Sequence, residues 1–173
     1  MNGSLISSLT RRMLYFEEGV FRWVQKCTSG KDTLGAGRNV EECRLTKDER
    51  IHLKLDTGRN LKKDPLTDEE VDWLLDSTLE HLKVVQVAMA TIGLAWGALN
   101  AVRQAVVISM VYQLGATKFL KFTGFISSVK AAQFEAAAGH IIDSKQYRSG
   151  VARPRWDRLA AAMRTGVAPS EWS

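Results

Sequence analysis

Apolar residues recur at helical spacing in the middle of the chain, directly after Pro65. A capping box precedes them, because Thr67 can accept a hydrogen bond from a free backbone amide while Glu70 reaches back to the start of the helix. One apolar face then follows at i, i+3, i+4 spacing, formed by Val71, Leu74, Leu75, Leu79 and Leu82. The pattern predicts a helix from about residue 68 to the mid-80s.

Two further helices are predicted from their apolar stripes and their ends. Asn100 can cap the start of one, and Gly115 suits its end, around the stripe Val102, Val106, Met110, Val111 and Leu114. We expect this helix to lie at the centre of the core. Near the N-terminus, a stripe ends at Gly19, which can adopt the left-handed conformation of a helix end, and consists of Leu5, Leu9, Met13 and Phe16.

Between these helices the pattern changes to short apolar pieces broken by turns. Residues 20–39 contain the breakers Thr28-Ser29-Gly30 and Gly35-Ala36-Gly37, which indicates small strands and tight turns. Residues 38–64 are polar and weakly patterned, and we expect a short helix plus loop there.

The rest of the chain predicts short helices over 123–138, 144–148 and 153–165, separated by Gly139 and Gly150. The expected fold is therefore α+β and predominantly helical, with two lobes. A small β-containing lobe covers 20–66, and a helical lobe covers 1–19 and 67–173, including a long connecting helix. Two such lobes leave a cleft, where ligands usually bind.

Composition narrows the class of protein only partly. The 173 residues carry 24 Lys and Arg against 19 Asp and Glu, a net charge of +5 that favours polyanionic surroundings. Two cysteines, Cys27 and Cys43, are too few for a disulfide scaffold or a four-ligand zinc site. Pairing of these two in an oxidising periplasm would be a switch that turns the site off.

Neither apolar segment predicts membrane insertion. The first 20 residues contain Arg11 and Arg12 and lack the pattern of a signal peptide. The run from Val84 to Leu99 has 16 residues, short of the roughly 20 that a bilayer span needs. We expect a buried helix there.

Glu18, at the end of the first predicted helix, is the main candidate for a catalytic carboxylate. The negative end of the helix dipole disfavours its anion, and shielding by Phe16 or Phe21 would raise the pKa further. A carboxylic acid that stays protonated near neutral pH can donate a proton to a glycosidic oxygen. A solvated glutamate at a helix end is the plainer interpretation of this feature alone.

The spacing of the residues that follow Glu18 resembles the spacing in a known family. The string Glu18-x8-Cys27-x5-Thr33-x-Gly35-x-Gly37 resembles the active-site signature of the phage muramidase family of T-even bacteriophage lysozyme. The family has Glu, Asp and Thr at these spacings, so this chain departs from it at Cys27. Residues 102–115 also resemble the family's central buried helix, and four further segments follow in the same order, namely 122–123, 134–137, 144–147 and 164–166. Before that helix, residues 58–60 and the capped helix at Thr67 also fit. The resemblance covers nearly the whole chain and is weakest over 38–57 and 83–98.

The resemblance implies roles for three residues. Glu18 would be the general acid, and Cys27 and Thr33 would hold or activate the water that attacks the opposite face of the sugar. An ordinary thiol is only slightly ionised at neutral pH, unless Lys26 or Lys31 lowers its pKa. Cys27 is therefore a thiolate base, a neutral thiol that orients water or a sulfur nucleophile, and a small buried hydrophobe is the structural alternative.

The resemblance also implies supporting residues. Arg155, or Arg153 in its place, would face the catalytic glutamate and pair with Glu17 or Glu18, which opposes the dipole and leaves the net pKa shift open. The matching saccharide-contact positions are Asn39, Tyr112, Phe125 and His140. Tyr112 is equally compatible with a core aromatic, and His140 with a solvated imidazole.

One feature of the family is absent from the chain. The family pairs a His just after the Gly-x-Gly turn with an Asp on the connecting helix. Arg38 and Thr78 stand at those places, so this ion pair is expected to be lost.

The expected protein is thus an endolysin that cleaves the β-1,4 bond between N-acetylmuramic acid and N-acetylglucosamine in peptidoglycan, as a monomer and without cofactor or metal. It would accumulate in the host cytoplasm and need a holin to reach the periplasm and cell wall, where it causes host lysis. A lytic transglycosylase that uses Glu18 alone is one alternative. A non-catalytic peptidoglycan-binding or virion structural protein is the other, since fold does not guarantee activity. The Arg-rich segment 148–158 lacks a recognised nucleic-acid-binding motif.

Overall fold

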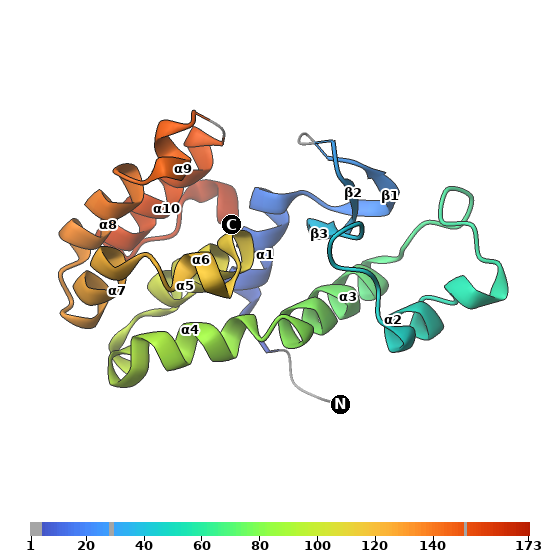
Figure 1. Ribbon diagram of the computed structural model, residues 1–173, viewed down its shortest axis with the longest axis horizontal. Helices are drawn as coiled ribbons and strands as arrows, with labels where there is room; N and C mark the ends of the chain where they lie inside the picture. The colour runs from blue at the N-terminus through green and yellow to red at the C-terminus, as the bar shows by residue number, and fades with distance from the viewer. Residues whose placement is uncertain (1–4, 28–29, 151) are drawn as a thin grey trace. The chain divides into compact units, whose positions relative to one another are not determined.

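The computed structural model describes residues 5–27, 30–150 and 152–173 (Figure 1). Helices make up most of this part of the chain, and one small antiparallel sheet completes it, so the predicted α+β, predominantly helical class is confirmed. The chain forms two compact units. One contains Leu14–His81 together with Leu5, and the other contains Ile6–Met13 and Leu82–Ser173.

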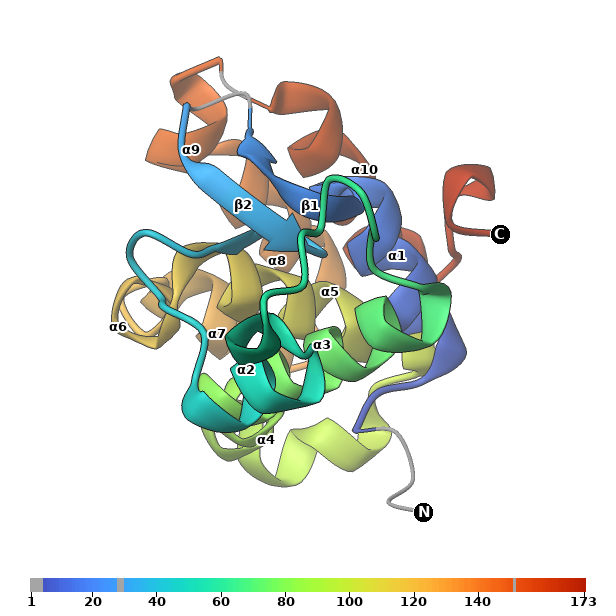
Figure 2. The same cartoon turned by 90° about the vertical axis from the view of Figure 1, so that its right-hand side faces the viewer.

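The first unit holds the sheet. The helix α1 (Ser8–Glu18) ends in this unit, and the strands β1 (Phe21–Lys26), β2 (Asp32–Gly35) and β3 (Arg38–Asn39) follow in the order β1-β2-β3. Both pairs are antiparallel, with Lys26 opposite Asp32 and Thr33 opposite Asn39, and Figure 2 shows β1 and β2 side by side. The unit continues through α2 (Lys47–His52), the 3₁₀ helix η1 (Leu55–Thr57) and α3 (Asp68–His81).

The core of this unit lies between the sheet and α3. It consists of the buried residues Leu34, Leu53, Leu61, Leu66, Val71 and Leu74. The approach is close at Gly35, where an added Cβ would lie 2.9 Å from Leu74 Cδ2. Because its apolar face covers the sheet, α3 belongs to the same compact unit as the strands, which therefore extends to His81 rather than to the predicted limit at residue 66.

The start of α3 is as predicted, but its end is not. Thr67 Oγ1 accepts from the Glu70 amide at 3.2 Å, and Glu70 Oε2 accepts from the Thr67 amide at 3.0 Å, which confirms the capping box. The helix stops at His81, since Lys83 adopts a left-handed conformation with φ of 52°. The predicted long connecting helix is therefore wrong: α3 is followed by a separate helix, α4 (Val84–Ile92).

The second unit is helical among its described residues. After the first part of α1 and α4, it contains η2 (Gly93–Ala98), α5 (Ala101–Leu114), α6 (Ala116–Phe119), α7 (Thr123–Lys130), α8 (Phe134–Ile142), α9 (Lys145–Arg148), α10 (Arg153–Thr165) and η3 (Ser170–Trp172). Residues 105–111 of α5 are all buried, which confirms its central position. Asn100 Oδ1 caps it by accepting from the Arg103 amide at 3.0 Å.

The segment 123–138, predicted as one helix, is two. Ala132 has a φ of 56°, a left-handed conformation that ends α7 and allows the chain to turn into α8. Gly139, predicted as a separator, lies inside α8. The intrinsic cost of a glycine in a helix is only about 1 kcal/mol, and the packing of α8 on α7 and α10 outweighs it.

The apolar run from Val84 to Leu99 is not one buried helix. Its α4 and η2 segments bury Val84, Ala88 and Ile92 but leave other apolar positions exposed. Met89 is 46% exposed and Leu94 is fully exposed. Within the described ranges, no helix combines the length and the apolar character that crossing a bilayer requires.

Candidate active site

Glu18 is the last residue of α1, and Gly19 ends the helix with a φ of 76°. Its side chain lies directly against the turn between β2 and β3. A Cβ added to Gly37 would lie 2.7 Å from Glu18 Cβ and 3.0 Å from Glu18 Oε2, and Gly37 itself has a φ of 76°. Gly37 is therefore required twice, for its left-handed backbone and for the space that the glutamate occupies.

Cys27 and Thr33 meet at one backbone carbonyl. The Cys27 amide donates to the Lys31 carbonyl at 2.9 Å, and Thr33 Oγ1 donates to the same oxygen at 3.0 Å. Cys27 follows β1 and is half-buried, while Thr33 lies in β2 and is 3% exposed. The β1–β2 hairpin thus brings these two predicted residues together, and the threonine hydroxyl also stabilises the connection between the strands.

The sheet sets the spacing between these residues and the turn that Glu18 contacts. Thr33 precedes Gly35 by two residues in β2, about 7 Å at about 3.3 Å per residue. The Glu18 side chain packs on Gly37 in the turn that follows Gly35. All three predicted catalytic residues therefore belong to the same compact unit.

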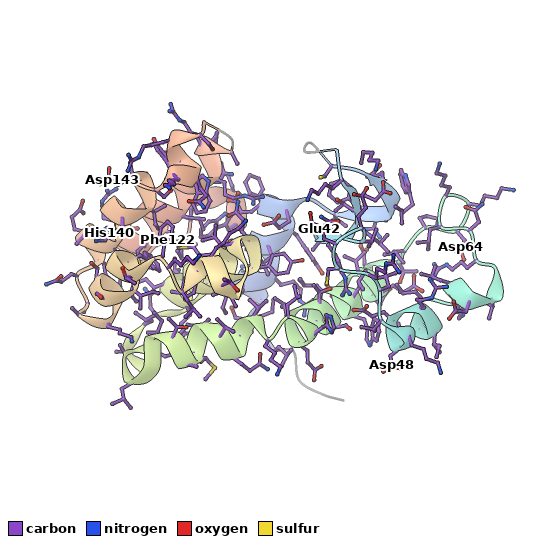
Figure 3. All side chains as sticks on the ribbon, viewed as in Figure 1. Glu42, Asp48, Asp64, Phe122, His140 and Asp143 are labelled. Atoms are coloured by element: carbon purple, nitrogen blue, oxygen red, sulfur yellow. The ribbon has the colours of Figure 1, made fainter. Side chains whose placement is uncertain are left out.

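The two lysines beside Cys27 are paired with carboxylates. Lys26 Nζ lies 2.9 Å from Asp32 Oδ1 and 2.8 Å from Glu41 Oε1. The hydrogen bond to Glu41 is the main cause that raises the pKa of Lys26, and the same bond lowers the pKa of Glu41. Lys31 pairs with Glu42, which Figure 3 labels beside the sheet. Because carboxylates offset both positive charges, these lysines give little support to a Cys27 thiolate.

These carboxylates were missed by the sequence analysis. For Asp32, the signal was the strand pairing, which sets it opposite Lys26.

Asn39 and Cys43 have structural contacts at the end of β3. Asn39 Oδ1 accepts from the amides of Glu41 and Glu42, at 3.0 and 3.1 Å. That oxygen therefore shapes the turn, and only the amide nitrogen of Asn39 is left for the predicted saccharide contact. Cys27 and Cys43 are not joined by a disulfide in the structure.

Of the predicted saccharide contacts in the helical unit, Phe125 has a packing role, whereas His140 is exposed. Phe125 is fully buried and makes edge-to-face contacts with Phe119 and Phe122. This is a core residue, and the prediction that it contacts sugar is wrong. His140 projects from α8 toward the start of α7 (Figure 3), where a Cβ added to Gly124 would lie 2.6 Å from its Cε1.

The other predicted residues are buried or half-buried. Tyr112 on α5 and Arg155 on α10 are half-buried, and Glu17 near the end of α1 is 8% exposed. Tyr112 and Arg155 belong to the helical unit, and Glu17 belongs to the unit that holds the sheet.

Arg38, expected to have lost its ion pair, has a different partner. Its Nη1 donates to Glu49 Oε1 at 2.5 Å and to Thr78 Oγ1 at 3.1 Å, and the side chains of Arg38 and Glu49 are 2% and 0% exposed. Glu49 also accepts from Ser77 Oγ at 2.8 Å. The sequence signal was the capping box Thr46-x-x-Glu49, which is present in the structure and begins α2.

In the part of the chain that the structure describes, no group of three or more His, Cys, Asp or Glu side chains could hold a metal ion. The site consists of the Glu18 carboxyl group at a helix end, with the Cys27 thiol and the Thr33 hydroxyl on the hairpin of the same unit. A search against models of known protein families finds no match to the chain.

Proposed function

We propose that the protein is a peptidoglycan hydrolase that cleaves the β-1,4 bond between N-acetylmuramic acid and N-acetylglucosamine. The observation that carries this proposal is the contact between Glu18 and Gly37, two members of the motif Glu18-x8-Cys27-x5-Thr33-x-Gly35-x-Gly37. A Cβ added to Gly37 would lie 2.7 Å from Glu18 Cβ, so a residue larger than glycine at position 37 would displace the glutamate.

In the proposed reaction, Glu18 protonates the bridging oxygen as the bond to the leaving sugar breaks. A water molecule attacks the anomeric carbon from the opposite face, which inverts its configuration; its proton passes to solvent, and Glu18 regains a proton from solvent before the next turnover. An inverting site needs about 6.5–9.5 Å between its two catalytic groups to hold that water. The β1–β2 hairpin holds Cys27 and Thr33 in the same compact unit as the end of α1 with Glu18, which supports this arrangement.

Cys27 and Thr33 would orient the water rather than ionise it. The pairing of Lys26 and Lys31 with carboxylates supports a neutral thiol, since neither lysine then stabilises a thiolate. A neutral thiol is a weak hydrogen-bonding group, so Thr33 would supply the stronger contact to the water, as an acceptor, because its hydroxyl proton is donated to the Lys31 carbonyl.

The same observation favours one second candidate. A lytic transglycosylase needs an acid/base glutamate but no activated water, because the sugar's own hydroxyl closes the ring. A site with one carboxylic acid and a neutral thiol fits that chemistry as well.

Product analysis separates these functions. Purified peptidoglycan is digested with the full chain, and the products are examined by mass spectrometry. Reducing N-acetylmuramic acid ends are expected from hydrolysis, and anhydromuramyl ends would instead identify a transglycosylase. Binding to peptidoglycan without any product, over the whole pH range in which the protein is folded, would favour the non-catalytic wall-binding or virion protein.

A biological setting can be proposed for this activity. We propose an endolysin that acts as a monomer on the wall of a bacterial host during phage release. It would need a holin to move from the host cytoplasm to the wall. Its net charge of +5 would favour adhesion to anionic envelope polymers.

A further inference from the structure

The helical unit carries an exposed apolar surface at the end of α4, next to α7 (Figure 1). We call this surface the apolar tip, and its exposed residues are Met89, Ala90, Gly93, Leu94, Gly97 and Ala98. Leu94 is fully exposed, and Met89 is 46% exposed. A surface helix of a globular protein normally turns polar residues outward. Here the buried face of α4, Val84, Ala88 and Ile92, and most of its outward face are both apolar.

The tip lies in a stretch without charge. From Val84 to Val102 the chain has no Asp, Glu, Lys, Arg or His. Trp96 lies within η2 and is half-buried, and an indole at the margin of an apolar surface is typical of membrane–water interfaces.

The surrounding sequence is basic only. From Leu82 to Phe134 the chain contains no Asp or Glu, whereas it contains Lys83, Arg103, Lys118, Lys121 and Lys130. The four lysines are exposed. Lys83 immediately precedes α4, and Lys130 is the last residue of α7, a helix that packs against both α4 and η2. Of these cations, Lys83 and Lys130 therefore lie on the elements that carry the apolar tip or pack against it, whereas Lys118 lines a pocket with residues of α9 and α10.

We propose that the apolar tip docks reversibly on a membrane surface that carries anionic lipids. The apolar residues would enter the boundary between headgroups and acyl chains, and the lysines would pair with phosphate groups. An anionic wall polymer would satisfy the lysines but offers no apolar phase for Leu94. A second copy of the chain would bring like-charged lysines together, which opposes self-association through this face. The docking surface lies in the helical unit, so the proposal does not depend on the chemistry proposed for Glu18.

The test uses the full chain and sedimentation with vesicles of phosphatidylglycerol or of phosphatidylcholine. We expect binding to phosphatidylglycerol at least about tenfold tighter than to phosphatidylcholine, and weaker at high salt. Leu94→Ser should reduce binding about tenfold or more, since burial of a leucine side chain is lost. Val167→Ser is the matched control, because Val167 is an apolar residue of the same unit that is 67% exposed and lies outside the tip.

Tryptophan fluorescence gives a second readout. A blue shift on addition of phosphatidylglycerol vesicles is expected for the wild type and should be smaller in Trp96→Phe. Equal binding to both lipids, no binding, or a Leu94→Ser variant that binds as the wild type does would overturn the proposal. So would a dimer, detected by light scattering, that Leu94→Ser converts to monomer, because the tip would then be covered by a second copy.

Discussion

Replacement of Glu49 by glutamine removes one charge from a buried pair without changing the shape of the side chain. Glu49 Oε1 accepts from Arg38 Nη1 at 2.5 Å and from Ser77 Oγ at 2.8 Å, while Oε2 accepts from the Thr46 amide at 2.7 Å. A glutamine has only one acceptor oxygen, so in either orientation its NH₂ group faces a donor. The variant therefore loses a charge-assisted hydrogen bond and leaves the Arg38 guanidinium buried without a counter-charge.

The expected loss follows from the burial of this pair. Removing one member of a buried ion pair typically costs about 3–5 kcal/mol, and the exposures of 2% and 0% place this pair in that class. Glu49→Gln should lower the free energy of unfolding by that amount, measured by urea denaturation at neutral pH and followed by circular dichroism. Asp56→Asn is the matched control, since its pair with Arg50 is about half exposed and should contribute about 0–1 kcal/mol. A loss below about 1 kcal/mol in Glu49→Gln would refute the reasoning.

Three further predictions test the unit that holds the sheet. Gly37→Ala should cost more than about 1 kcal/mol in thermal unfolding and lower activity on peptidoglycan, because its Cβ would displace Glu18; full stability and activity would contradict this. The hydrogen bond from Arg59 lowers the pKa of Glu70, so its stabilisation is present above the unfolded value and is lost as pH falls through the folded value. Glu70→Gln should therefore flatten the fall in stability below about pH 5, whereas Glu69→Gln, an exposed neighbour, should keep the wild-type slope. Cys27→Ala should reduce activity by less than the roughly 10² that a general base contributes, since a neutral thiol only orients the water, and Cys27→Asp should remain active; an unimpaired Cys27→Ala would make Cys27 a structural residue.

Sequence reasoning predicted elements whose signals are local. The caps at Thr67 and Asn100 use partners three residues away, so the chain alone identifies both helix starts. The break at Lys83 has no such signal, because a lysine in the left-handed conformation is held there by its surroundings. For the same reason the division of α7 from α8 at Ala132 was missed.

Packing between distant segments was the harder part of the site. Phe125 was assigned to the saccharide site by its matching position in the resembled family, and only the folded chain shows that its ring is buried. The partner of Arg38 is eleven residues away on α2, and only the folded chain brings Glu49 to it. The contact of Glu18 with Gly37 likewise depends on how α1 meets the sheet. The motif contains both Glu18 and Gly37, and the tertiary structure provides the contact between them.

The most direct test of the proposed role of Glu18 is the release of reducing ends from purified peptidoglycan by the wild type and by Glu18→Gln. Both proteins are first shown to be folded. The glutamine has nearly the same shape as the glutamate but carries no acid proton to deliver to the bridging oxygen. We predict clear release by the wild type and a loss of about 10² or more in the variant. Equal release by the two proteins would contradict the central claim that Glu18 is the general acid.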